Sequence, residues 1–172
     1  MLKMIGAFLL TGGCIGYGLS LNITMRRAEA EMKEFIYIFQ MMKSDISYRK
    51  ETLPQACCHT GKKVGKKIGE FLLKAAIKTE QEREHSFAYH WKREGEQYFK
   101  DSVLPKAEQK LILNFPEYTG FSDEQMQITV LEEFISELSD KRADMDICMK
   151  DRQRVVMGLS TVSGLVLTIL LL

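Results

Sequence analysis

The chain has 172 residues, of which 45% are hydrophobic and 27% are charged, and its formal net charge is +1. Apart from Lys3, every charged residue lies in the middle segment 26–154, which holds 23 basic and 23 acidic residues. This balance argues against a nucleic-acid-binding domain, because such domains show a clear basic excess. Nucleic acid is therefore not an expected partner.

The chain begins and ends with uncharged apolar stretches, at residues 4–25 and 155–172. A helix rises about 1.5 Å per residue, so both stretches are long enough to cross a hydrocarbon core about 30 Å thick. They predict terminal transmembrane helices at residues 1–25 and 155–172, joined by one polar domain at residues 26–154. A cleaved signal peptide is the alternative for the first stretch, with Cys14 in a partial lipoprotein cleavage box.

Basic residues flank both apolar stretches on the side of the middle segment. Arg26, Arg27 and Lys33 follow the first stretch, whereas its outer flank offers only Lys3. A second basic group precedes the C-terminal stretch and consists of Lys141, Arg142, Lys150, Arg152 and Arg154. Because an excess of Lys and Arg marks the cytoplasmic flanks of membrane helices, we expect an integral membrane protein with a cytoplasmic middle domain.

Apolar residues at spacings of three and four predict helices through the first half of the middle segment. The first helix continues the N-terminal stretch and ends near Arg49. Thr52 is expected to cap a second helix that has Pro54 in its first turn. A third helix is expected along the apolar stripe of residues 64–76.

Three more helices are expected in the second half. Ser86 opens the fourth, which Gly95 weakens, and the fifth begins at Pro105 and stops at Pro116. Ser122 caps the sixth, which continues without a break into the C-terminal stretch. The predicted fold class is therefore all-α, a membrane helical hairpin that carries one cytoplasmic helical bundle.

No motif for enzyme chemistry emerges from the sequence. The run from Gly61 to Lys67 resembles a phosphate-binding loop, but it has three residues between its glycines instead of four, and Lys67 replaces the Ser or Thr that binds magnesium. Cys57 and Cys58 stand beside His59, yet adjacent cysteines are poorly spaced for a tetrahedral metal site. We therefore predict inert thiols and no catalytic, metal, cofactor or small-molecule site.

Charge is segregated along the middle segment. Residues 26–80 contain 12 basic and 7 acidic residues, whereas residues 81–154 contain 11 basic and 16 acidic residues. Oppositely charged surfaces suit docking to other proteins, and two solvated helix faces are the alternative. Anionic membrane lipid is a second possible partner of the four lysines between Lys62 and Lys67. The candidate partner-binding residues are the lysine run (Lys62, Lys63, Lys66 and Lys67) and the acidic group (Glu132, Glu133, Glu137, Asp140 and Asp144).

Small residues recur every four positions in both apolar stretches. At this spacing they let two helix backbones approach closely in lipid, so they predict packing between membrane helices. The residues are Gly12, Gly16 and Ser20 in the first stretch, and Ser160, Gly164 and Thr168 in the second.

Several short motifs run from one end of the chain to the other. They are Met1-Leu2-Lys3-Met4-Ile5-Gly6-Ala7, Ile46-Ser47-Tyr48, Thr52-Leu53-Pro54-Gln55-Ala56, Gly120-Phe121-Ser122-Asp123-Glu124-Gln125 and Gly158-Leu159-Ser160. In order, spacing and chain length, the sequence resembles the stage III sporulation protein AB family of endospore-forming bacteria. It departs from that pattern at Cys57-Cys58 and in the glycine-lysine run that follows.

That resemblance implies a non-enzymatic membrane component of the channel complex between mother cell and forespore. The family is similar to platform protein F of type II secretion and type IV pilus machines. The middle domain would face the mother-cell cytoplasm from the outer forespore membrane. Its implied partners are the sporulation ATPase, stage III sporulation protein AA, and other membrane components of the complex. The alternatives are a membrane-anchored helical adaptor or signalling protein unrelated to secretion and, with less support, a small transporter or channel subunit.

Overall fold

The computed structural model describes residues 2–82, 84–118 and 124–171, and in these ranges the regular structure is entirely helical. This confirms the all-α prediction. The helices in chain order are α1 (Leu2–Arg49), α2 (Leu53–Val64), α3 (Lys66–Gln81), α4 (Phe87–Tyr98), α5 (Lys106–Tyr118) and α6 (Glu124–Leu171).

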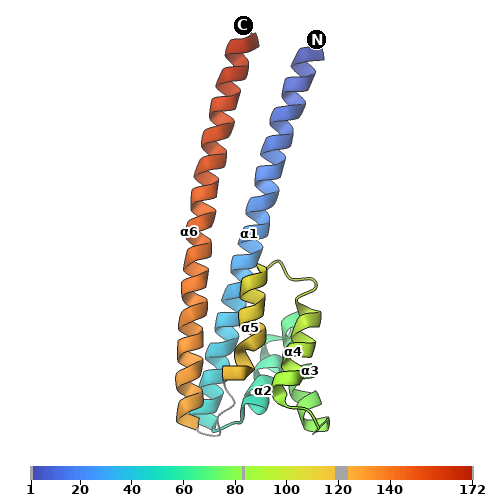
Figure 1. Ribbon diagram of the computed structural model, residues 1–172, viewed down its shortest axis with the longest axis vertical. Helices are drawn as coiled ribbons and strands as arrows, with labels where there is room; N and C mark the ends of the chain where they lie inside the picture. Colours follow the sequence, from blue (N-terminus) through green and yellow to red (C-terminus); the bar gives the residue numbers. More distant parts are fainter. Residues whose placement is uncertain (1, 83, 119–123, 172) are drawn as a thin grey trace.

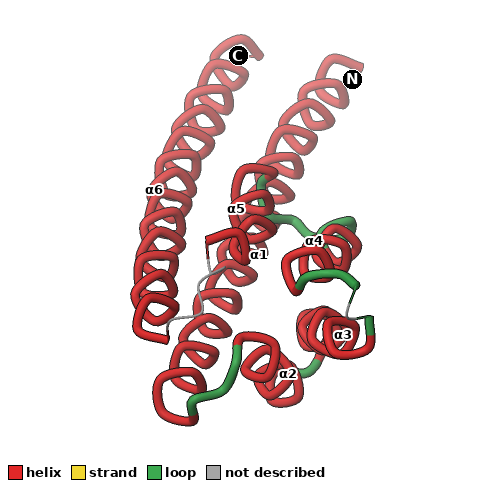
Figure 2. The backbone as a smooth tube through the Cα atoms, turned by 60° about the horizontal axis from the view of Figure 1, so that its bottom comes forward, coloured by secondary structure: helices red, strands yellow, loops and turns green. Residues whose placement is uncertain are grey.

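The two longest helices, α1 and α6, form an antiparallel pair. Each has 48 residues and is therefore about 72 Å long. Both chain termini lie at one end of this pair, and α2–α5 pack near the other end (Figure 1). Figures 1 and 2 place α6 on one side of α1 and α2–α4 on the other side.

The core lies where α1 meets the smaller helices and α6. The buried stripe of α1 follows spacings of three and four, as predicted, and includes Met32, Phe35, Phe39, Met42 and Ile46. Phe39 lies at the centre, with its ring centroid 4.6 Å from that of Phe115 in α5 and 4.9 Å from that of Phe134 in α6. Burial of a side chain of this size stabilises a fold by about 1.5–3 kcal/mol.

Trp91 connects α4 to both α3 and α5. It is fully buried, and its ring centroid lies 4.8 Å from that of Phe71. Its indole Nε1–H donates a hydrogen bond to the Ile112 carbonyl, at 2.9 Å. One turn away, Gly95 is the point of close approach, because a Cβ there would lie 2.5 Å from a methyl carbon of Leu113. Gly95 therefore serves the packing of α4 on α5.

Pro116 does not stop α5, contrary to the prediction, because the helix continues to Tyr118. A proline has no N–H to donate, so Pro116 leaves the carbonyl four residues earlier without its usual helical partner. That carbonyl belongs to Ile112, and it accepts the Trp91 indole N–H instead. The hydrogen bond from a neighbouring helix thus compensates for the proline.

The turn between α2 and α3 also differs from the prediction. Val64 ends α2 instead of joining the third helix, because Gly65, with a φ of 60°, interrupts the helical backbone. The two helices then cross closely, and a Cβ on Gly69 would lie 2.6 Å from the Gly61 carbonyl oxygen. Both glycines of the phosphate-loop-like run therefore have structural roles, Gly61 in packing and Gly65 in the turn.

Two of the three predicted helix caps lie in the described residues, and both are confirmed as N-caps. The Thr52 backbone N–H donates to Gln55 Oε1 at 3.0 Å, and Pro54 occupies the first turn of α2. The Ser86 side chain accepts the Tyr89 backbone N–H at 3.4 Å. The third, Ser122, lies outside the described residues.

Residues 4–25 and 155–172 fall within or at the end of α1 and α6, but most of their side chains lie outside the described part of the chain. Among the residues that are described, no helix contains a stretch long and apolar enough to cross a membrane. The predicted membrane hairpin thus stays a prediction.

Candidate functional site

The acidic group lies on α6. Glu133, Glu137, Asp140 and Asp144 are exposed and separated by four, three and four residues, which places them on one face of the helix. We call these four residues the acidic stripe. Within the described part of the chain, none of them forms an ion pair. Glu132 differs, because Lys43 Nζ of α1 lies 3.2 Å from its Oε1.

The lysine run lies on the other side of α1, at the end of α2 and the start of α3. All four side chains are exposed. Lys66 Nζ lies 3.5 Å from Glu34 Oε1, and Lys67 Nζ lies 2.9 Å from Asp101 Oδ2. The hydrogen bond to Asp101 raises the pKa of Lys67 and lowers that of Asp101. The structure therefore does not bring the two charged groups together, and half of the lysine run is paired within the chain.

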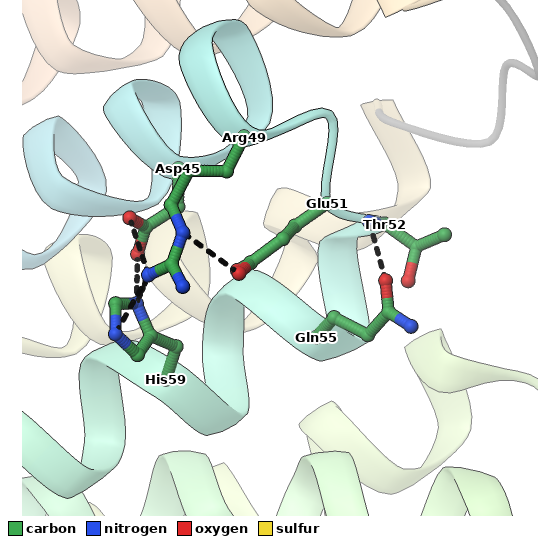
Figure 3. Close-up of polar contacts among 6 residues, drawn as sticks. All are labelled: Asp45, Arg49, Glu51, Thr52, Gln55 and His59. Atoms are coloured by element: carbon green, nitrogen blue, oxygen red, sulfur yellow. Dashed lines mark hydrogen bonds and ion pairs between the residues drawn. The ribbon is translucent and has the colours of Figure 1, made fainter.

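A third polar group, absent from the sequence-based candidates, lies where α1 ends and α2 begins (Figure 3). Asp45, Arg49, Glu51 and His59 form this polar corner. His59 Nδ1 is 2.7 Å from Oδ2 of Asp45, which is only 6% exposed. The Arg49 guanidinium lies 2.8 Å from His59 Nε2 through Nη1 and 3.2 Å from Glu51 Oε1 through Nε. These charge-assisted contacts tie α1 to α2.

The backbone of this corner adopts an uncommon conformation. Lys50 follows the last residue of α1 with a φ of 56°, a position where glycine is the usual residue. Left-handed backbone costs a non-glycine residue about 1–2 kcal/mol. The turn is closed by the Lys50 backbone N–H, which donates to the Ile46 carbonyl at 3.2 Å. The side chain of Tyr48, two residues before Lys50, is 85% exposed.

Among the residues that the structure describes, three side chains of the polar corner are close enough together to hold a metal ion. The ligand atoms of Asp45, Glu51 and His59 lie within 4.8 Å of one another. Carboxylate and imidazole ligands suit zinc and related ions. Arg49 already contacts all three side chains and supplies the positive charge. The polar corner therefore joins α1 to α2 through ion pairs and hydrogen bonds. The absence of a bound metal stays a prediction.

Cys57, Cys58 and His90 lie in the core of the middle segment or at its edge. Burial raises the pKa of the Cys57 thiol well above its usual value, which keeps the thiol protonated and unreactive. Cys58 is half-buried. His90 is fully buried, and neither ring nitrogen forms a hydrogen bond within the described part of the chain. Its closest acid is Glu82, with Oε2 3.9 Å from His90 Nε2. This arrangement provides no activated nucleophile.

The predicted membrane-packing residues are mostly untested. The side chains of Gly12, Gly16, Ser160, Gly164 and Thr168 lie outside the described part of the chain. Ser20 is exposed, and its backbone carbonyl accepts a hydrogen bond from Thr24 Oγ1 at 3.1 Å. Helix packing through these small residues stays a prediction.

Two comparisons with known proteins lead to the same family. A family model described as stage III sporulation protein AB matches residues 3–172. No curated protein sequence matches. Among solved structures, the chain is similar to one titled "Stage III sporulation protein AB", with a TM-score of 0.63 and 15% identity. That likeness covers 72% of this chain and 97% of the other, and at this identity it concerns the fold alone.

Proposed function

The chain belongs to the stage III sporulation protein AB family, and from this we propose that it is a non-enzymatic membrane platform within the sporulation channel complex. Its middle domain faces the mother-cell cytoplasm and docks the sporulation ATPase. The observation that carries the proposal is the antiparallel pair of α1 and α6 (Figure 1). Both chain ends lie together, as a membrane hairpin requires, and the bundle lies near the other end.

The distribution of charge supports the same orientation. Arg26 and Arg27 on α1 and Arg154 on α6 lie at the inner ends of the apolar stretches, and Arg142 lies further along α6. Arg142 also joins the two helices, because its Nε lies 3.3 Å from Glu29 Oε1. Lys33 contacts the same carboxylate at 2.9 Å, and both cations lower the pKa of Glu29. A cytoplasmic end of the hairpin explains this basic enrichment.

We assign the docking of the ATPase to the acidic stripe of α6 in preference to the lysine run. Two lysines of the run are engaged by Glu34 and Asp101. The four carboxylates of the acidic stripe form no ion pair within the described residues and extend along about three turns of one rigid helix. A regular row of free charges provides electrostatic steering and register for a basic partner surface.

A charge-reversal experiment tests this assignment. The triple variant Glu133→Lys, Glu137→Lys and Asp140→Lys should lose most copurification with the ATPase, because like charges across an interface repel. A matched control reverses three exposed acids on other helices, Glu80, Glu96 and Glu117, and should bind normally. Equal binding by both triple variants and the natural chain would reject the acidic stripe as the docking face.

Membrane topology has an independent test in the exposed Cys148 of α6. A membrane-impermeant maleimide should label this thiol in inside-out vesicles and leave it unlabelled in right-side-out vesicles. The Cys148→Ser variant controls for the other cysteines. Labelling from the outer side would overturn the proposed orientation, and recovery of the protein in the soluble fraction would overturn membrane attachment.

A further inference from the structure

The α2–α3 turn and the α4–α5 loop lie at the end of the bundle that points toward the chain termini (Figure 1). Their contacts with α1 fix this position. One carboxylate oxygen of Glu31 accepts the Tyr98 hydroxyl at 2.9 Å, and the other accepts the Val103 backbone N–H at 3.4 Å. Lys66 reaches Glu34. This end of the bundle is therefore level with residues 31–34 of α1.

That level is close to the bilayer expected from the proposed function, on which this inference rests. The first apolar stretch ends at Met25, and Glu31 follows six residues later, or about 9 Å along the helix. The polar headgroup layer occupies about 5–7 Å on each side of the hydrocarbon core. Measured along α1, the α4–α5 loop thus lies at the edge of the headgroups, within the reach of an extended lysine side chain.

A basic groove opens beside this loop, between α4 and α5. It has a volume of about 480 Å³, and its lining includes Lys92, Lys100, Lys106 and Lys110 but only one acid, Glu96. All four lysines are exposed, and none forms an ion pair within the described part of the chain. Lys106 Nζ donates a hydrogen bond to the neutral side chain of Gln109, at 3.2 Å. The groove therefore has several positive charges that the bundle itself does not neutralise.

Apolar side chains accompany these lysines. Phe99 and Leu113 line the groove, and Val103 is 37% exposed on the loop next to it. The lysines of such a site can donate hydrogen bonds to a phosphate group, while apolar parts of the same ligand contact the wall of the groove. A phospholipid with a negatively charged headgroup has both features.

We propose that the α4–α5 groove binds the headgroup of an anionic phospholipid from the membrane that holds the hairpin. Lys100 and Lys106 lie nearest the bilayer and receive the phosphate, with Lys92 and Lys110 deeper in the groove. Each lysine near an anionic membrane surface strengthens attraction several-fold, and the effect extends over a Debye length. The contact fixes the bundle against the membrane at a second point beside the helical hairpin.

The test uses the full chain in a non-ionic detergent and a soluble, short-chain phosphatidylglycerol as the probe. Titration calorimetry should show binding at least tenfold tighter than for phosphatidylcholine of the same chain length. The variant Lys100→Gln with Lys106→Gln should bind phosphatidylglycerol about 30-fold more weakly. A matched variant, Lys43→Gln with Lys74→Gln, removes two charges that do not line the groove and should bind as the natural chain does.

Fluorescence of the buried Trp91 verifies that each variant is folded. Equal affinity for the two lipids, or an equal loss in both double variants, would overturn the proposal. Such a result leaves the labelling of Cys148 and the copurification with the ATPase unchanged, so it is distinct from failure of the proposed function. Conversely, outer-side labelling of Cys148 would reject the orientation whatever lipid the groove binds.

Discussion

The aromatic core around Trp91 and the polar corner at the end of α1 hold neighbouring helices together by different means. In the core, Trp91 is surrounded by Phe39, Phe71 and Phe115, with ring centroids between 4.8 and 6.2 Å from its own. In the polar corner, the helices are joined by ion pairs and hydrogen bonds, and Arg49 is 52% exposed.

This difference separates stability from positioning. Apolar burial stabilises a fold in proportion to the area removed from water, and it places few demands on direction. Charge-assisted bonds require particular atoms at particular distances, but solvent screens them where one partner is exposed. We therefore expect the core to supply most of the free energy of folding, and the polar corner to fix the angle at which α2 leaves α1.

The largest expected effect comes from removing the centre of the core. Trp91→Ala should lower the free energy of unfolding by about 3–5 kcal/mol, because it leaves a cavity and an unsatisfied Ile112 carbonyl. Chemical denaturation followed by circular dichroism measures the change. Trp91→Phe keeps an aromatic ring and loses the hydrogen bond, so its cost should be about 1–3 kcal/mol. A loss below 1 kcal/mol for Trp91→Ala would contradict the central role of this residue.

A smaller effect is expected from breaking the polar corner. Asp45→Ala leaves Arg49 and His59 without their buried carboxylate and should cost about 1–2 kcal/mol, because the exposed Arg49 can turn to water. The exposed Glu133→Ala on α6 is the control and should change the same denaturation midpoint by less than about 0.5 kcal/mol. Equal effects of the two substitutions would show that the polar corner does not hold α2.

The smallest expected effect sharpens the comparison by stabilising the polar corner. Lys50→Gly removes a side chain from a residue with a φ of 56°, whereas Lys50→Ala removes nearly the same side chain and keeps the unfavourable conformation. The glycine variant should therefore unfold at a higher temperature and be about 1 kcal/mol more stable than the alanine variant. A more stable alanine variant would show that the left-handed turn is not under strain.

The sequence predicted the helices well wherever their local chemistry is decisive. The stripe of α1, the caps at Thr52 and Ser86, and the unbroken course of α6 all depend on residues within one or two turns of each other. Pro116 was misjudged as a helix end, because its compensating donor is the Trp91 indole, which comes from another helix. A contact of that kind leaves no periodic signal in the sequence.

The polar corner was missed for a related reason. Asp45 and Arg49 are four residues apart and could have been recognised as a pair on one helix face. His59 joins them only because the left-handed turn at Lys50 brings α2 back against α1. In the sequence, His59 stands next to Cys57 and Cys58, which suggests a metal site, whereas in the structure its ring faces Asp45 (Figure 3).

The equal length of α1 and α6 has a mechanical consequence. Each is an uninterrupted rod about 72 Å long with no proline in it, and the smaller helices lie along one part of the pair. If such a rod tilts by about 10°, its far end moves by about 12 Å. A partner that tilts the bundle by about 10° would therefore move both chain ends by about the diameter of a helix.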